Sequence, residues 1–190
     1  MSPLMQKGES MQNILIVNIS GTGNEAEALR QTLENMNYFV CIKNIGRPKD
    51  FTDILSGKLL FDPDCIIVSC HGHDGKIIMP TLGDSLYETN EPKGDFSCEE
   101  IRRFIDISGK VIINLGCTTG SQALADTFSA NNIYIAPTGY IDGNAALFFA
   151  IRLFYELTSR KCDIKDAYLS AKKTDHETHL FCMQQNKKRI

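Results

Sequence analysis

Five short runs of apolar residues set the strongest constraint on what this chain can fold into. Each run is four to six residues long, which is too short for most helices, and too uniformly apolar for a strand with one wet face. The runs lie at 14–19, 38–42, 65–70, 110–115 and 133–136. We interpret all five as strands buried on both faces of a sheet.

Helical patterns fill the segments between these runs. Ala26, Leu29, Leu33 and Met36 recur at helical spacing and predict a helix from about residue 25 to 36. Further helices are expected after Pro48, over 145–157 and from Asp163, and capping pairs predict helix starts at Asn24/Glu27, Ser97/Glu100 and Thr119/Gln122. Strands that alternate with helices favour right-handed crossovers and a mostly parallel central sheet. The predicted fold class is a single three-layer α/β domain.

Length and charge restrict the organisation further. A chain of 190 residues can bury one self-sufficient core, so we expect one domain over 1–190, with polar tails at 1–12 and 175–190. The net charge of −3 provides no basic field for a phosphate backbone, so nucleic acid is not an expected partner. The N-terminus has no apolar run of signal-peptide length, and no run in the sequence reaches the roughly 20 residues that span a membrane, so no membrane association is expected.

The seven cysteines favour a reducing compartment. Their number is odd, they are scattered, and no CxxC pair occurs, whereas a disulfide framework or a zinc ribbon needs paired spacings. We therefore expect a cytoplasmic protein. Five of the seven, which we interpret as small packing residues, are Cys41, Cys65, Cys98, Cys162 and Cys182.

Two of the predicted strands are followed by residues with chemically reactive side chains. The third predicted strand leads into His71-Gly72, and the fourth leads into Cys117 just before a predicted helix. Ligands bind at the carboxyl ends of parallel strands, so these residues can meet if the two strands are neighbours. A nucleophilic thiol needs a base or a positive potential, which His71 and the helix N-terminus offer. The amides of Gly72 and Cys117 are candidates for binding an oxyanion.

An apolar block ending in His71-Gly72, followed by an apolar block ending at Cys117, resembles the caspase-like cysteine peptidases: caspases, metacaspases, separase and, closest in character, the bacterial CHAT domains. The resemblance extends over roughly residues 14–173. It includes the turn at Ser20-Gly-Thr and a later segment that combines Pro137, a loop with Asp142 and the helix over 147–155.

The resemblance implies a cysteine-type endopeptidase without cofactor or metal, in which a His71/Cys117 dyad cleaves protein or peptide substrates. It also implies control by cleavage, by calcium or by a regulatory protein partner. This chain departs from the family at two specificity positions. The turn where caspases carry an arginine holds Asn18, Ile19 and Ser20. Two residues before the nucleophile, where several relatives that cut after arginine or lysine carry an aspartate, this chain has Leu115. Ser20 and Asp142 remain as substrate-binding candidates, Asp142 for a basic side chain.

Other readings of the same residues stay open. His73 competes with His71 as the base, and Cys70 is either a packing residue or a redox thiol. Zinc bound by Cys70, His71, His73 and Cys117 is a further hypothesis, which the alternation of side chains along a strand disfavours. Gly21-Thr-Gly23-Asn-Glu-Ala26 fits a dinucleotide fingerprint, although Lys43 and Asn44 stand where an acidic residue is expected. A catalytically silent module that binds a partner protein is the main alternative to an enzyme.

Overall fold

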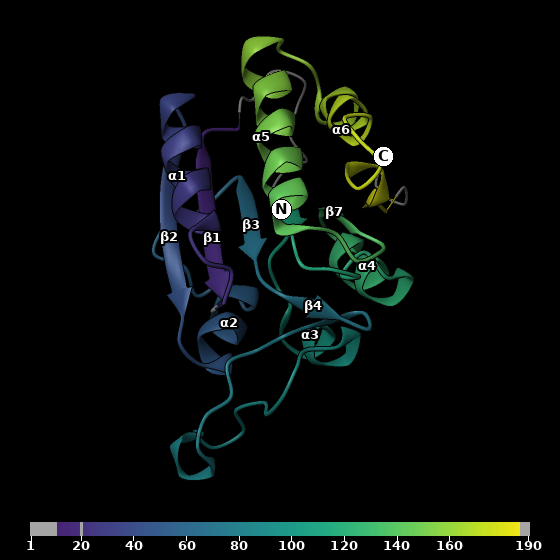
Figure 1. Cartoon of the computed structure of the whole chain (residues 1–190). Coiled ribbons are helices and arrows are strands. Elements are labelled where there is room, and N and C mark those ends of the chain that lie inside the picture. The colour runs from purple at the N-terminus through teal and green to yellow at the C-terminus, as the bar shows by residue number, and fades with distance from the viewer. Residues whose placement is uncertain (1–10, 20, 187–190) are drawn as a thin grey trace.

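A six-stranded sheet forms the centre of the molecule (Figure 1). The computed structural model describes residues 11–19 and 21–186. The strands, in the spatial order β2-β1-β3-β6-β7-β8, are β2 (Phe39–Ile45), β1 (Asn13–Ile19), β3 (Cys65–Ser69), β6 (Val111–Asn114), β7 (Ile133–Pro137) and β8 (Phe181–Gln185). All neighbours are parallel except β7 and β8, which are antiparallel. The predicted α/β fold class with a mostly parallel sheet is confirmed.

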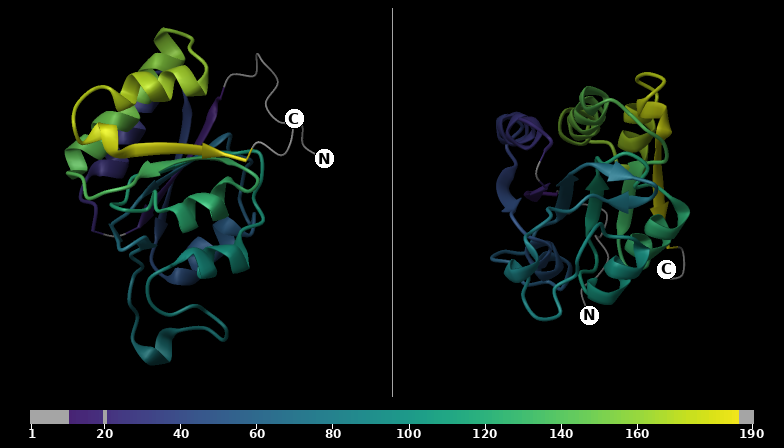
Figure 2. Two further views of the ribbon diagram at one scale, coloured as in Figure 1. Left: turned by 90° about the vertical axis from the view of Figure 1, so that its right-hand side faces the viewer. Right: turned by 60° about the horizontal axis from the view of Figure 1, so that its bottom comes forward.

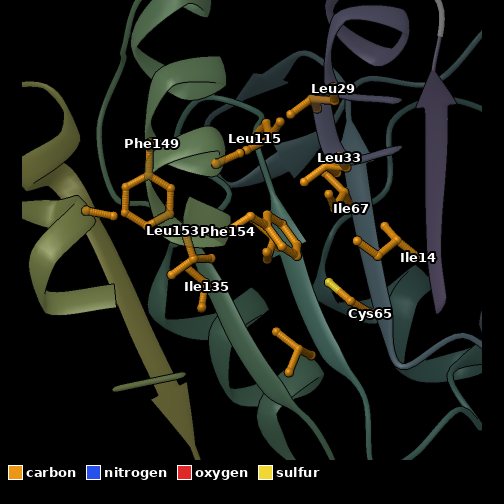
Figure 3. Packing of buried hydrophobic residues seen from close by; sticks show 14 of the residues in the cluster. Ile14, Leu29, Leu33, Cys65, Ile67, Leu115, Ile135, Phe149, Leu153 and Phe154 are labelled. Carbon is orange, nitrogen blue, oxygen red and sulfur yellow. The ribbon is translucent and has the colours of Figure 1, made fainter. Parts of the chain in front are cut away.

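Helices cover both faces of the sheet (Figures 1 and 2). One face is covered by α1 (Glu25–Asn35), α5 (Gly143–Ser159) and α6 (Ile164–Lys172), and the other by α2 (Pro48–Leu55), α3 (Cys98–Phe104) and α4 (Gln122–Ser129). Figure 3 shows the first core, which includes Leu29 and Leu33 of α1, Phe149 of α5 and Ile67 of β3. Each such side chain contributes about 1.5–3 kcal/mol by leaving water.

The register of the two central strands brings two loops side by side. Val68 of β3 lies opposite Asn114, the last residue of β6. The chain that leaves β3 at Cys70 and the chain that leaves β6 at Leu115 therefore emerge at the same edge of the sheet. This placement is what positions the candidate site.

The segment 71–94 contains more structure than its composition predicts. It begins with a small hairpin of β4 (Gly72–His73) and β5 (Lys76–Ile77) and continues through a single 3₁₀ turn, η1 (Asp84–Leu86). Figures 1 and 2 show that the part around η1 extends away from the body of the molecule. Glu91 anchors this arm, which comprises residues 79–95. Its buried carboxylate accepts hydrogen bonds from the Arg47 side chain, which precedes α2, and from the amide of Lys49 in α2.

The helix starts agree with the sequence at some places and differ at others. Ser97 and Glu100 form the expected capping box, and Asp163 caps α6. Asn24 stands at the start of α1, but its side chain makes no capping hydrogen bond. The predicted cap at Thr119 is wrong: its buried hydroxyl donates to the Gly116 carbonyl, and Ser121 takes the cap position of α4.

The C-terminal segment differs from the polar tail we expected. Residues 178–180 form the 3₁₀ turn η2 (Thr178–Leu180), and β8 then adds to the edge of the sheet. The physical reason is Phe181, whose buried ring stacks on Phe149 with centroids 3.7 Å apart. The run from Phe181 to Met183 is too short to stand out by periodicity.

No helix within the described residues combines the length and the apolar character needed to cross a membrane.

Candidate functional site

His71 follows β3 and has an exposed side chain. Its Nε2 atom lies 2.9 Å from the carbonyl oxygen of Gly21 in the loop between β1 and α1. A carbonyl oxygen only accepts, so Nε2 must carry the hydrogen. In the neutral ring Nδ1 is then the nitrogen with the free lone pair, and the Gly21 contact both orients the ring and selects its tautomer.

Cys117 follows β6 and is half-buried beneath the loop 138–142. Its Sγ atom lies 3.4 Å from both the carbonyl oxygen and the amide nitrogen of Ile141, donating to the first and accepting from the second. In the part of the chain that the structure describes, no hydrogen bond joins the Cys117 thiol to the His71 imidazole. Both dyad candidates thus bond to main-chain groups of neighbouring loops.

The two motif turns interlock through their glycines. A Cβ on Gly72 would lie 2.1 Å from the Cys117 carbonyl oxygen, and a Cβ on Gly116 would lie 2.8 Å from the Cys70 Sγ atom. Only glycine permits backbones to approach this closely. The structure therefore brings His71-Gly72 and Cys117 to one point of the sheet edge.

The two candidate oxyanion donors are free within residues 11–19 and 21–186. The Cys117 amide donates to no acceptor there. In the β4–β5 hairpin the His71 carbonyl accepts from the Ile78 amide, which makes the next pair, Gly72 and Ile77, a non-hydrogen-bonded pair. The Gly72 amide therefore points away from its hairpin partner, and both amides are available for a ligand.

The hairpin turn is tied to the loop over Cys117. The Tyr140 hydroxyl lies 2.8 Å from His73 Nδ1 and donates to Asp74 at 3.2 Å, while the Gly75 amide donates to the Thr118 hydroxyl at 3.0 Å. Thr118 has a φ of 59°, which is uncommon for a β-branched residue and is held here by its amide bond to the Gly139 carbonyl. His73 is thus engaged in the contacts that tie the turn to this loop, away from the Gly21 carbonyl that orients His71.

A depression of about 370 Å³ opens beside these loops. Its lining includes Thr22, next to the Gly21 contact of His71, and Asp142, next to the Ile141 contact of Cys117. Two carboxylates border it, those of Glu25 and Asp142. Burial raises the pKa of Glu25, while a 2.6 Å hydrogen bond from Ser69 and the nearby His71 act in the opposite direction. The Asp142 side chain also caps α5 by accepting from the Asn144 amide.

The structure gives little support to the other hypotheses drawn from the sequence, which concern a metal site, a dinucleotide site and a redox role for Cys70. Ser20 lies outside the described residues. In the described part, no three histidine, cysteine or acidic side chains gather in a way that could hold a metal ion. Carboxylates rather than cations border the depression after Gly21–Gly23, which is unfavourable for a phosphate. Cys70 is buried, and burial raises the pKa of its thiol far above the ordinary range, so it stays protonated.

Several residues at the site were not identified from the sequence. Gly21 and Ile141 act through main-chain atoms, which no residue pattern can indicate. Glu25 was assigned only to a helix start, and Asn114 only to a strand end. The signal that could have indicated Glu25 is an acidic residue at the start of the helix that follows β1, because β1 lies next to the strand that leads into His71.

The sheet order and the helical layers form a caspase-like α/β fold, as comparison with a solved structure shows. The crystal structure of drICE, a caspase, is one solved structure with this arrangement. It matches 93% of this chain and 88% of its own with a TM-score of 0.51 and 16% sequence identity. At that identity the likeness concerns the fold alone. No protein-family model matches the sequence. No curated protein sequence matches it either.

Proposed function

We propose that this protein is a cysteine-type endopeptidase that uses His71 and Cys117. The observation that carries the proposal is the interlock of the two motif turns, in which Gly72 lies against the Cys117 carbonyl. That contact brings a histidine with a defined base nitrogen, a half-buried thiol and two free amides to one sheet edge. The fold, shared with a caspase, gives the same expectation.

The chemistry follows from these groups. His71 takes the thiol proton of Cys117 at Nδ1, and the sulfur attacks the carbonyl carbon of the scissile peptide bond. The resulting oxyanion accepts hydrogen bonds from the Gly72 and Cys117 amides. His71 then returns the proton to the leaving amine, and a thioester remains on Cys117. Water, deprotonated by His71, hydrolyses the thioester and restores the free thiol.

Labelling with an electrophilic peptide probe tests this proposal. We expect covalent labelling of Cys117 that disappears in Cys117→Ala and falls about 100-fold in His71→Ala, because general-base assistance contributes roughly 10²–10⁴-fold. Cys98→Ala is the matched control, since Cys98 is another partly exposed free thiol and should label as the wild type does. Equal labelling of the wild type and Cys117→Ala would exclude the proposal.

The substrate residue before the cleaved bond is proposed to be basic. The depression beside the dyad is bordered by Glu25 and Asp142, and within the described residues no cation pairs with either carboxylate. The Ser69 hydroxyl fixes one oxygen of Glu25, which leaves the other for a ligand. Asp142 keeps the substrate-binding role assigned from the sequence, and Ser20 remains a sequence-based candidate.

Matched peptide substrates test this preference. With lysine or arginine before the bond, kcat/KM should exceed that for aspartate or alanine, and Glu25→Gln should reduce the advantage about 10-fold through loss of a charged hydrogen bond. Glu34→Gln, on the same helix but away from the depression, is the control. An unchanged preference in Glu25→Gln would remove Glu25 from the specificity site.

A partner-binding module without turnover is the second candidate. It is favoured by the two contacts of the Cys117 thiol with Ile141, which cover the sulfur in this conformation. Labelling of Cys117 only after a second protein is added would instead indicate a peptidase controlled by a regulatory partner.

All seven cysteines are free thiols, which supports a reducing compartment such as the cytoplasm.

A further inference from the structure

Asn114 ends β6 with a side chain that is completely buried between the two motif turns. Its Oδ1 atom accepts from the Gly116 amide at 2.9 Å and from the Cys70 Sγ atom at 3.3 Å. One oxygen atom therefore receives a hydrogen bond from each turn. Cys70 directly precedes His71, and Gly116 directly precedes Cys117.

Both donors are fixed in their roles. The buried Cys70 thiol stays protonated and can only donate to the carbonyl-type oxygen of Asn114. The Gly116 amide bonds the side chain two residues before it, which is an Asx turn and sets the direction in which the chain enters Cys117. A side chain at position 116 would collide with the Cys70 sulfur, so the three groups form one closely fitted unit.

The same asparagine carries a cost. Its Nδ2 atom is buried and makes no hydrogen bond of normal geometry in the described part of the chain, although the buried Tyr134 hydroxyl lies close to the Asn114 amide. An unsatisfied buried donor destabilises a fold, and an apolar residue at this strand end would avoid that cost. The residue is thus poorly explained by stability alone.

We propose that Asn114 is a positioning residue for the His71/Cys117 pair, tying the turn that carries the base to the turn that carries the nucleophile. This inference rests on the proposed function. Without the Asn114 oxygen, the Gly116 amide and the Cys70 thiol lose their common acceptor, and the Cys117 thiol shifts relative to His71. The role is indirect, since within the described residues Asn114 is hydrogen-bonded neither to the Cys117 thiol nor to the His71 imidazole.

Alkylation of Cys117 by iodoacetamide, followed by mass spectrometry, measures this role without a peptide substrate. Asn114→Leu keeps the side-chain size and removes the acceptor. We expect the rate at pH 7 to fall about 10-fold, because a thiol without base assistance is only a few per cent thiolate. Asn114→Asp retains an acceptor in the same place and should preserve most of the rate.

Asn132→Leu is the matched control. Asn132 is also buried and also bonds main-chain groups, those of Lys110, Ile107 and Phe128, but it lies before β7 at the other end of the sheet. It should lower the thermal midpoint and leave the alkylation rate of the folded protein unchanged. An equal loss of rate in both variants would reduce Asn114 to a structural residue.

A double-variant cycle isolates positioning. If Asn114 acts through the relation between the thiol and His71, Asn114→Leu should change the rate less than about 2-fold in a His71→Ala background. Rate losses that multiply in the double variant would overturn the inference.

Amide hydrogen exchange keeps the inference distinguishable from the proposed function. If His71→Ala alone leaves alkylation unchanged, the dyad proposal fails, yet Asn114→Leu should still accelerate exchange at Gly116 while Asn114→Asp does not. Unchanged exchange at Gly116 in Asn114→Leu would show that the tie itself does not exist.

Discussion

A methyl group on Gly72 would lie 2.1 Å from the Cys117 carbonyl oxygen and 2.8 Å from the Thr119 Cγ2 atom. Neither neighbour can yield easily, because one is backbone and the other belongs to a buried side chain. We expect Gly72→Ala to displace the hairpin from Cys117, lowering probe labelling about 100-fold and the free energy of unfolding by about 1–3 kcal/mol. Probe labelling and urea unfolding check the two effects separately.

Gly83 provides the comparison for this substitution. It lies in the exposed arm with an ordinary negative φ, and the nearest atom to an added Cβ is 3.9 Å away. Gly83→Ala should therefore change stability by no more than about 0.5 kcal/mol and leave labelling intact. If Gly72→Ala behaves like Gly83→Ala, the two motif turns are not in contact.

Glu25 makes a pH-dependent contribution to stability whose sign follows from its surroundings. Burial raises its pKa in the folded protein, so the folded state binds more protons than the unfolded state above the ordinary glutamate pKa of about 4.3. The contribution of Glu25 to stability is therefore lost as the pH rises through this window. Glu25→Gln, which cannot ionise, should raise the thermal midpoint at pH 7 more than at pH 4. A constant difference across this range would contradict the burial of a charged carboxylate.

At the scale of elements, the arm from residue 79 to 95 depends on one buried carboxylate. Glu91 accepts from Arg47 Nη2 at 2.5 Å, from the Lys49 amide at 2.8 Å and from the Glu88 amide at 2.9 Å. These bonds, the Arg47 bond foremost, lower the pKa of Glu91 to about 2. The stabilisation that Glu91 gives to the arm is fully present above the ordinary glutamate pKa and is lost as the pH falls toward 2.

We expect Glu91→Gln to release this arm without unfolding the domain. Loss of a charged hydrogen-bond network should increase the rate of tryptic cleavage after the exposed Lys93 about 10-fold at pH 8, with little change in the thermal midpoint. Asp84→Asn is the control, because the Lys93–Asp84 ion pair is exposed and such pairs contribute about 0–1 kcal/mol. Equal cleavage rates in the two variants would mean that Glu91 does not anchor the arm.

The elements that could be predicted are those with a strong local signal. The five apolar runs became strands, and the Ser97/Glu100 and Asp163 caps begin helices as expected. The β4–β5 hairpin was not foreseen, because it consists of two residue pairs around an Asp74-Gly75 turn and its pairing carries no apolar alternation. β8 was not predicted for a related reason: its stability comes from the ring of Phe181, which stacks on Phe149 of α5, a helix distant in the sequence.

At the scale of the whole molecule, the alternation of strands and helices predicted that His71 and Cys117 follow strands that end at the same edge of a parallel sheet. The sequence left open whether these strands are neighbours, and the structure shows that β3 pairs with β6. The sequence did not predict the contacts that orient the two side chains, because Gly21 and Ile141 contribute main-chain atoms whose positions depend on tertiary packing. Glu25 enters the site for the same reason, through the way α1 sits on the sheet.

The C-terminal segment connects global stability to the site. The Leu180 carbonyl accepts from the Thr138 amide at 2.9 Å, and Glu177 accepts from the Asp142 amide at 2.6 Å, so this segment supports the loop that covers Cys117 from both ends. Phe181 follows directly and secures the segment by its buried ring and by the 2.9 Å bond from the Tyr168 hydroxyl to its carbonyl.

Phe181→Ala should therefore lower the free energy of unfolding by about 3–5 kcal/mol, the usual cost of removing a buried phenylalanine ring. Chemical denaturation measures this loss, and Phe39→Ala, at a side chain that is 59% exposed, should cost about 1 kcal/mol or less. Because the loop over Cys117 loses its support, labelling of Cys117 by the peptide probe should also change in Phe181→Ala under conditions where the domain remains folded. If β8 is lost while labelling stays at the wild-type rate, the loop is held by Tyr140 and Thr118 alone, and the C-terminal segment contributes to the fold but not to the site.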